Sequence, residues 1–136
     1  MTNAQPLTAD VGDIAGHLSL LGLPAEVVEL DGGNRAIRAT TSGIPFSGFL
    51  FRNEEQKSPY LMLSAMFPDR KVDAHWANAW NNRFPLTRAS ITAAGEPMLT
   101  HSMILTGIDT DHLKEAISWW DLLLRIFVEE LIAATS

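Results

Sequence analysis

The longest amphipathic stretch of the chain decides the fold: residues 109–134 read DTDHLKEAISWWDLLLRIFVEELIAA. Apolar residues recur in it at the spacing of an α-helix, so the segment is predicted to form one long final helix. Asp109, Thr110 and Asp111 supply capping oxygens and negative charge at its start, where backbone N–H groups lack partners. The stripe predicted to face the core consists of Leu113, Ala116, Ile117, Trp120, Leu124, Phe127, Val128 and Leu131.

A second apolar stripe lies beside the first on the same helix. It consists of Trp119, Leu122, Leu123 and Ile126 and is termed the outer stripe below. Together the two stripes cover about 240° of the helix, whereas a one-sided surface helix needs only about 100°. The apolar surface beyond the part that faces the sheet is expected to be covered either by another helix of the same chain or by a second copy in a homodimer. The four residues are therefore the candidate partner-binding residues, with Trp119 the strongest candidate because tryptophan is enriched at protein contacts.

The N-terminal half of the chain is predicted to form one helix and four strands. The helix covers residues 11–21, with Thr8 or Asp10 as its candidate N-cap. The turn Asp31-Gly32-Gly33-Asn34 joins the first two strands, because its glycines allow the positive φ of a tight hairpin. The period-two segments predicted as strands are residues 25–30, 35–41, 44–52 and 60–67.

The strand predicted at residues 60–67 differs from the others because it is apolar on both faces. Leu61, Leu63 and Phe67 alternate with apolar residues such as Met62 and Met66. Such a strand is expected either in the centre of the sheet or under a helix, with a partner on its other side.

A second helix and two further strands precede the final helix. Val72, Trp76 and Trp80 fall four residues apart on one helical face, and Asp69 or Asp73 could cap that helix. The strands are predicted at residues 86–93 and 97–105. Since short hairpins join antiparallel strands, the fold class is predicted to be α+β, a two-layer sandwich with helices largely on one face of an antiparallel sheet. The element order is α-β-β-β-β-α-β-β-α.

The composition predicts one acidic, soluble globular domain over residues 1–136. The 136 residues include no cysteine, and 10 Lys plus Arg face 16 Asp plus Glu, for a net charge of −6. Thiol nucleophiles, disulfides and zinc thiolates are excluded, and nucleic-acid binding is disfavoured by the negative charge. No secretory signal is evident at the N-terminus, and no apolar stretch reaches the roughly 18 residues of a membrane span. A cytoplasmic location is therefore expected.

The sequence contains no evident catalytic constellation. His101 and Ser102 are adjacent in a predicted strand, so their side chains lie on opposite faces and cannot pair. The pairs Glu54-Glu55 and Glu129-Glu130 are interpreted as solvated surface charge, because general acid–base pairs need an apolar cleft. No enzymatic activity is predicted. An enzyme that uses His101 or His112 with a carboxylate is the least favoured of three hypotheses.

Two acidic clusters contain residue types that can ligate divalent metals. They are Asp69, Asp73 and His75, and Asp109, Asp111 and His112. Each cluster lies where a helix is predicted to start, and acidic side chains stabilise helix starts without any metal. Neither a metal nor a cofactor is therefore predicted.

A family resemblance rests on residues 78–84, which read NAWNNRF, and on the elements that follow them. These are a strand, the turn Gly95-Glu96-Pro97, a second strand ending near Gly107 and a tryptophan-bearing final helix. In this order the chain resembles the YbjN family over about residues 11–131, although the turn has Gly95-Glu96 in place of an Asp-Gly pair. The resemblance implies a bacterial sensory transduction regulator with a fold like that of type III secretion chaperones. Proteins of that shape commonly dimerise and bind segments of other proteins.

The functional prediction combines the absence of a catalytic pattern with the outer stripe. It is a non-enzymatic regulator or chaperone-like module that binds another protein, either through an exposed sheet edge or through the apolar helix surface, and that acts as a homodimer. The alternative is a small-molecule sensor domain whose pocket lies between sheet and helices. The residues expected to line that pocket are Met62, Met66, Trp76, Trp80 and Met103.

Overall fold

The computed structural model describes residues 4–52, 55 and 59–135, so Glu54 of the predicted carboxylate pair lies outside the described residues. Three α-helices and six strands follow one another in the predicted order. The helices are α1 (Val11–Leu20), α2 (Ala74–Arg83) and α3 (Thr110–Thr135). The strands are β1 (Ala25–Glu29), β2 (Arg35–Thr41), β3 (Ile44–Phe51), β4 (Tyr60–Met66), β5 (Arg88–Ile91) and β6 (Pro97–Ile104).

The strands form one open antiparallel sheet in the order β1-β2-β3-β4-β6-β5. The predicted α+β class, the antiparallel sheet and the element order are confirmed. β4 lies between β3 and β6 in the centre of the sheet, which agrees with its apolar pattern. β1 and β5 are the edge strands, and they differ in length, with 5 and 4 residues.

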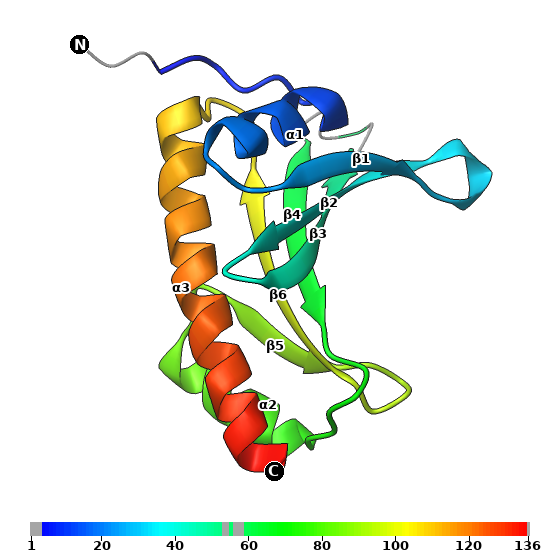
Figure 1. Cartoon of the computed structure of the whole chain (residues 1–136), viewed down its shortest axis with the longest axis vertical. Helices are drawn as coiled ribbons and strands as arrows, with labels where there is room; N and C mark the ends of the chain where they lie inside the picture. The colour runs from blue at the N-terminus through cyan, green and yellow to red at the C-terminus, as the bar shows by residue number, and fades with distance from the viewer. Residues whose placement is uncertain (1–3, 53–54, 56–58, 136) are drawn as a thin grey trace.

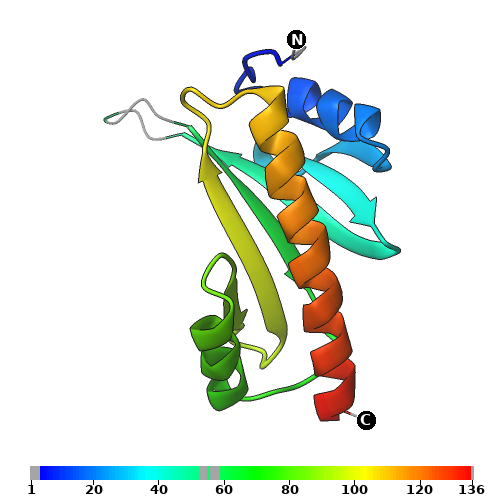
Figure 2. The same ribbon diagram turned by 90° about the vertical axis from the view of Figure 1, so that its left-hand side faces the viewer.

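The helices pack on one face of the sheet, and α3 crosses the length of that face (Figure 1). α1 and α2 lie near opposite ends of α3 and on opposite sides of it (Figure 2). α3 has 26 residues, but charged side chains interrupt its apolar surface. In the part of the chain that the structure describes, no helix combines the length and apolar content needed to cross a membrane.

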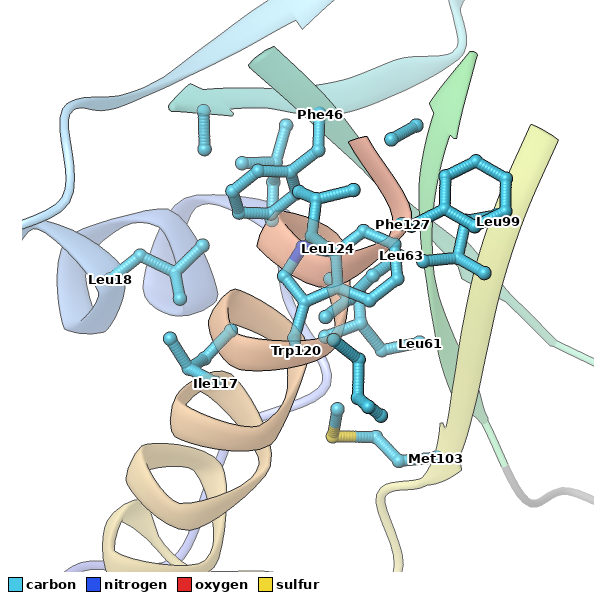
Figure 3. Close-up of a cluster of buried hydrophobic side chains, with 14 of the residues drawn as sticks. Leu18, Phe46, Leu61, Leu63, Leu99, Met103, Ile117, Trp120, Leu124 and Phe127 are labelled. Carbon is cyan, nitrogen blue, oxygen red and sulfur yellow. The ribbon is translucent and has the colours of Figure 1, made fainter. Parts of the chain in front are cut away.

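The core forms where α3 meets the inner face of the sheet (Figure 3). Trp120 packs edge-on against Phe46 of β3, with 5.8 Å between ring centroids. Leu63 of β4 and Leu124 of α3 are both fully buried, as the alternation of β4 and the helical stripe of α3 require. Each large core side chain contributes about 1.5–3 kcal/mol of transfer free energy, so this interface dominates the stability of the domain.

Several boundaries differ from the sequence-based expectation for local reasons. Asp10 and Asp73 are the N-caps of α1 and α2, where their side chains accept hydrogen bonds from backbone N–H groups three residues on. Val72 therefore precedes α2 instead of lying on it, although it still packs against the core. β5 is half as long as predicted, because the Thr87 N–H is donated back to the Phe84 carbonyl before the strand and a turn begins at Thr92 after it, where the Gly95 N–H is donated to the Thr92 carbonyl. The shortness of β5 leaves part of β6 unpaired on its outer side.

Candidate interaction surface

The four residues of the outer stripe lie in three different environments. Trp119 and Leu122 are exposed, at 47% and 38% of their full areas. Ile126 is half-buried and packs against the core. Leu123 is only 3% exposed and belongs to the core itself. The structure therefore leaves Trp119 and Leu122 as the members of the outer stripe that offer apolar area to a partner.

The C-terminal half of α3 is covered on this side by α2. The rings of Trp76 and Trp80 contact Phe127 at centroid distances of 5.2 and 5.0 Å. Arg83 of α2 donates two hydrogen bonds of 2.8 Å to the Glu130 carboxylate, and this ion pair raises the pKa of the arginine. α2 thus packs beside the C-terminal half of α3 through Phe127 of the core stripe and through Glu130, neither of which belongs to the outer stripe.

The N-terminal half of α3 instead borders a groove that separates it from β6. This β6–α3 groove has a volume of about 670 Å³ and is lined by residues of both elements. Trp119 and Ala116 form its helical wall, and Met103 and Ile108 contribute apolar surface opposite. The other residues that line it are Leu86, His101, Ser102, Ile104, His112 and Glu115.

One side of the β6–α3 groove is the unpaired part of β6, which is termed the free edge of β6 and spans residues 101–104. The pairing of β5 with β6 ends at Thr100, and within the described chain no strand continues beyond it. The Leu105 N–H donates toward β4, to the Pro59 carbonyl at 3.0 Å. Because successive residues of an antiparallel strand point their backbone groups to alternate sides, Ser102 and Ile104 direct N–H and C=O outward.

The groove brings together three titratable side chains, His101, His112 and Glu115. His101 Nδ1 lies 3.0 Å from the Leu86 carbonyl, and since a carbonyl oxygen only accepts, this ring nitrogen donates the hydrogen bond. Glu115 has no ion pair with any residue that the structure describes. The groove therefore combines apolar side chains with two imidazole rings and one carboxylate, the carboxylate lying on its helical wall.

The acidic clusters considered as metal ligands contain the aspartates that cap the first turns of α2 and α3. Asp73 accepts the Trp76 N–H at 3.0 Å, and Asp109 accepts the His112 N–H at 2.9 Å. Among residues 4–52, 55 and 59–135, no group of three His, Asp or Glu side chains is arranged to hold a metal ion. These hydrogen bonds provide a structural role for both aspartates.

A cluster of hydrogen bonds around Asp121 fixes the opposite side of α3 to the β2–β3 turn, and the sequence analysis did not predict it. It consists of Thr41, Ser42, Asp121 and Arg125 and is termed the Asp121 latch. Asp121 accepts hydrogen bonds from the Thr41 and Ser42 hydroxyls at 2.6 and 2.7 Å and from Arg125 at 3.0 Å. Partial burial raises the pKa of Asp121, but the hydrogen bonds from Thr41, Ser42 and Arg125 outweigh burial and lower the pKa overall. The signal in the sequence was the Ser42-Gly43 pair, which forms the β2–β3 turn with positive φ at both residues.

The sheet face opposite the helices is a second exposed apolar surface. Phe51 stacks on Tyr60 at 5.0 Å between centroids, and Ile104, next to Tyr60 in register, is 63% exposed. Met62 and Met66 also lie on this face, since they alternate with the buried Leu61, Leu63 and Ala65 of β4. The methionines are thus separated by the sheet from Trp80 and Met103, and the expected sensor pocket is not formed by the residues predicted to line it.

Comparison with known proteins identifies the family. The model of the YbjN family, described as "putative bacterial sensory transduction regulator", matches residues 10–133 of the 136-residue chain. The chain therefore belongs to the YbjN family, and the resemblance based on residues 78–84 is confirmed. No curated protein matches the chain. The family description is that of a regulator and not of an enzyme.

Proposed function

We propose that this YbjN-family protein is a non-enzymatic regulator that acts by binding another protein through the exposed part of the outer stripe. The observation that carries the proposal is the position of Trp119. It is 47% exposed and forms the wall of the β6–α3 groove, next to a free sheet edge. A large, half-exposed indole beside an apolar groove is the kind of residue that dominates binding energy at protein interfaces.

Charge and neighbouring residues around Trp119 also favour a protein partner. Ala116 and Leu122 extend the apolar area along α3, and Glu115 lies at the rim of the same surface. An apolar centre with a polar rim is the usual anatomy of a protein interface. Exposed apolar patches of this kind on small domains mark association sites.

A homodimer is the form of association that the sequence analysis predicts. A second copy would bring the exposed residues Trp119 and Leu122 against their symmetry mates across a two-fold axis. Size-exclusion chromatography with light scattering at micromolar concentration is then expected to give twice the monomer mass of 14.9 kDa. Trp119→Glu is expected to return the mass to that of a monomer. A monomeric wild-type chain would contradict the dimer and leave a different protein as the partner.

The central experiment places a photo-crosslinking residue at position 119 of the full chain in its native host. A matched control places the same group at Leu20, which is 83% exposed on α1 and away from the groove. The proposal expects a discrete crosslinked protein from position 119 and none from position 20. Trp119→Glu should abolish binding of that protein, whereas Leu20→Glu should not. Equal crosslinking from both positions, or from neither, would contradict the proposed contact surface.

A small-molecule sensor remains the second candidate because of the size of the β6–α3 groove. Its volume of about 670 Å³ lies within the range of small-ligand sites, and His101, His112 and Glu115 offer polar contacts. A bound metabolite would appear as added mass in native mass spectrometry and as a thermal shift. Retention of bare-chain mass together with no shift across a metabolite panel would eliminate this candidate.

The non-enzymatic part of the proposal is tested separately. His101 and His112 line one groove with Glu115, which places the residues of the enzyme hypothesis in the same region. Purified protein is expected to show no turnover of generic ester and phosphate substrates. Turnover that disappears in His112→Ala would contradict a non-enzymatic role.

A further inference from the structure

The two edges of the sheet differ in how they are protected against pairing with another strand. The β1 edge follows Pro24 and carries Glu26 and Glu29, the kinds of residue that keep exposed edges from pairing. The free edge of β6 has no proline and no Lys, Arg, Asp or Glu between residues 101 and 104. Ser102 and Ile104 present backbone donors and acceptors there without such protection.

From this difference we propose that the free edge of β6 receives an extended segment of the partner protein as an additional strand in line with β5. The inference rests on the proposed function and specifies the partner's conformation. Backbone hydrogen bonds to Ser102 and Ile104 would hold the segment, as in other cases of strand addition to a sheet edge. Every second side chain of the segment would then enter the β6–α3 groove.

The dimensions of the groove suit a short strand. Four residues of β-strand extend about 13 Å. The helical wall between His112 and Trp119 extends about 11 Å along α3. Two or three alternate side chains of the added strand can therefore contact α3, and the apolar residues Ala116, Trp119 and Met103 favour aliphatic side chains at those positions.

The charge in the groove predicts one further side chain of the partner segment. Glu115 is the carboxylate on the helical wall, and no cation of the described chain pairs with it. The whole chain has a net charge of −6, which also favours a basic partner. The expected segment thus carries aliphatic residues at alternate positions with Lys or Arg at the groove-facing position opposite Glu115.

A second copy of the chain fits this edge less well than a peptide. In a two-fold pair of β6 strands, β5 of each copy occupies the edge at residues 97–100. Only about four residues per copy could then pair. A separate peptide is not limited in this way, and its side chains can also fill the groove.

The test selects a phage-displayed library of random twelve-residue peptides on the immobilised full chain. We expect enriched peptides that alternate aliphatic and polar residues and contain Lys or Arg in the aliphatic register. The key variant is Ser102→Pro, which removes an outward N–H and is compatible with an edge strand. Binding should weaken at least tenfold. The matched control Glu29→Pro removes an outward N–H on the β1 edge and should leave binding unchanged, with circular dichroism verifying both folds.

Amide hydrogen exchange of the wild-type protein provides a measurement that needs no variant. In the free protein the Ser102 and Ile104 amides should exchange like those of unstructured peptides, while the Leu105 amide, bonded to Pro59, is protected. Adding a selected peptide should protect Ser102 and Ile104. This result identifies strand pairing even where Ser102→Pro does not fold.

Each of the remaining outcomes overturns the strand proposal. Peptides with helical spacing, whose binding is lost in Trp119→Glu but not in Ser102→Pro, would overturn it and leave the proposed protein-binding function intact. Protection of Ser102 and Ile104 in a dimer without peptide would assign the edge to a second copy. A failure to enrich any peptide would also overturn it, independently of the crosslinking result from position 119.

Discussion

The two halves of α3 carry similar apolar sequences but have different surroundings. In the C-terminal half, Phe127 is fully buried and touches the rings of Phe67, Trp76 and Trp80 at 5.7, 5.2 and 5.0 Å. In the N-terminal half, Trp119 is 47% exposed on the wall of a groove. The difference shows that an apolar arc on a helix does not define one role: one half stabilises the domain, and the other half is available to a partner.

The largest expected effect is a difference in the free energy of unfolding between a substitution in the C-terminal half of α3 and one in the N-terminal half. Phe127→Ala should lower the free energy of unfolding by about 3–5 kcal/mol, because it leaves a cavity among three aromatic rings. Trp119→Ala should lower it by only about 1–2 kcal/mol, because about half of the side chain is already exposed. Urea unfolding measures both values. Equal losses would show that the N-terminal half is as much a part of the core as the C-terminal half.

A smaller effect is expected on the side of α3 that faces the β2–β3 turn. Asp121→Asn replaces a charged acceptor of the hydrogen bonds from Thr41 and Ser42 with a neutral amide. The free energy of unfolding at neutral pH should fall by about 1 kcal/mol. Urea unfolding is the measurement, and Asp69→Asn on the exposed loop before α2 is the matched control. An unchanged stability would show that the latch contributes nothing measurable.

The same latch predicts a pH dependence with a definite sign. The pKa of Asp121 is lowered in the folded state, so its carboxylate stabilises the fold at pH values above the unfolded aspartate pKa of about 3.9. That stabilisation is lost as the pH falls through the lowered folded-state pKa. The stability difference between wild type and Asp121→Asn should therefore shrink on acidification. A difference that stayed constant down to strongly acidic pH would refute the role of the charge.

The smallest effect is expected from the ion pair that joins α2 to α3. Glu130→Gln removes the charge that Arg83 contacts twice at 2.8 Å. Stability should fall by less than in Asp121→Asn, because the pair is exposed and salt screens it. The adjacent Glu129→Gln is the control, since Glu129 has no ion pair within the described chain. At low salt, thermal unfolding should show a lower melting temperature for Glu130→Gln than for the wild type. At high salt this difference should disappear, and Glu129→Gln should show no such difference at either salt concentration.

The fold could be predicted from sequence because its signals are local and consistent. The central position of β4, the caps Asp10 and Asp73 and the helical stripe of α3 all agree with the final structure. The apolar character of both β4 faces was also visible. The different roles of the two faces could not be predicted: one face joins the core, while the other forms an exposed surface with Phe51 and Tyr60.

The candidate site could be predicted only in part. Trp119 was identified from its position on a helical wheel, but the same wheel placed Leu123 beside it, although Leu123 is buried. Burial depends on how far the sheet and α2 wrap around α3, and a single helix does not reveal that. The free edge of β6 was equally hidden, because it results from the turn at Thr87 that shortens β5.

The four tryptophans give the molecule a built-in optical reporter. Trp80 donates its Nε1–H to Thr87, and the buried Trp120 has an Nε1 without a hydrogen-bond partner in the described chain. Both indoles are shielded from water and should emit at short wavelength, whereas Trp119 is half-exposed and should emit further to the red. Trp76 is only partly buried, so the acrylamide-accessible, red component of the emission spectrum belongs first to Trp119 and in smaller part to Trp76. The Trp119 share is the part that is missing from the spectrum of Trp119→Phe. Its disappearance on titration gives occupancy of that surface without any attached dye.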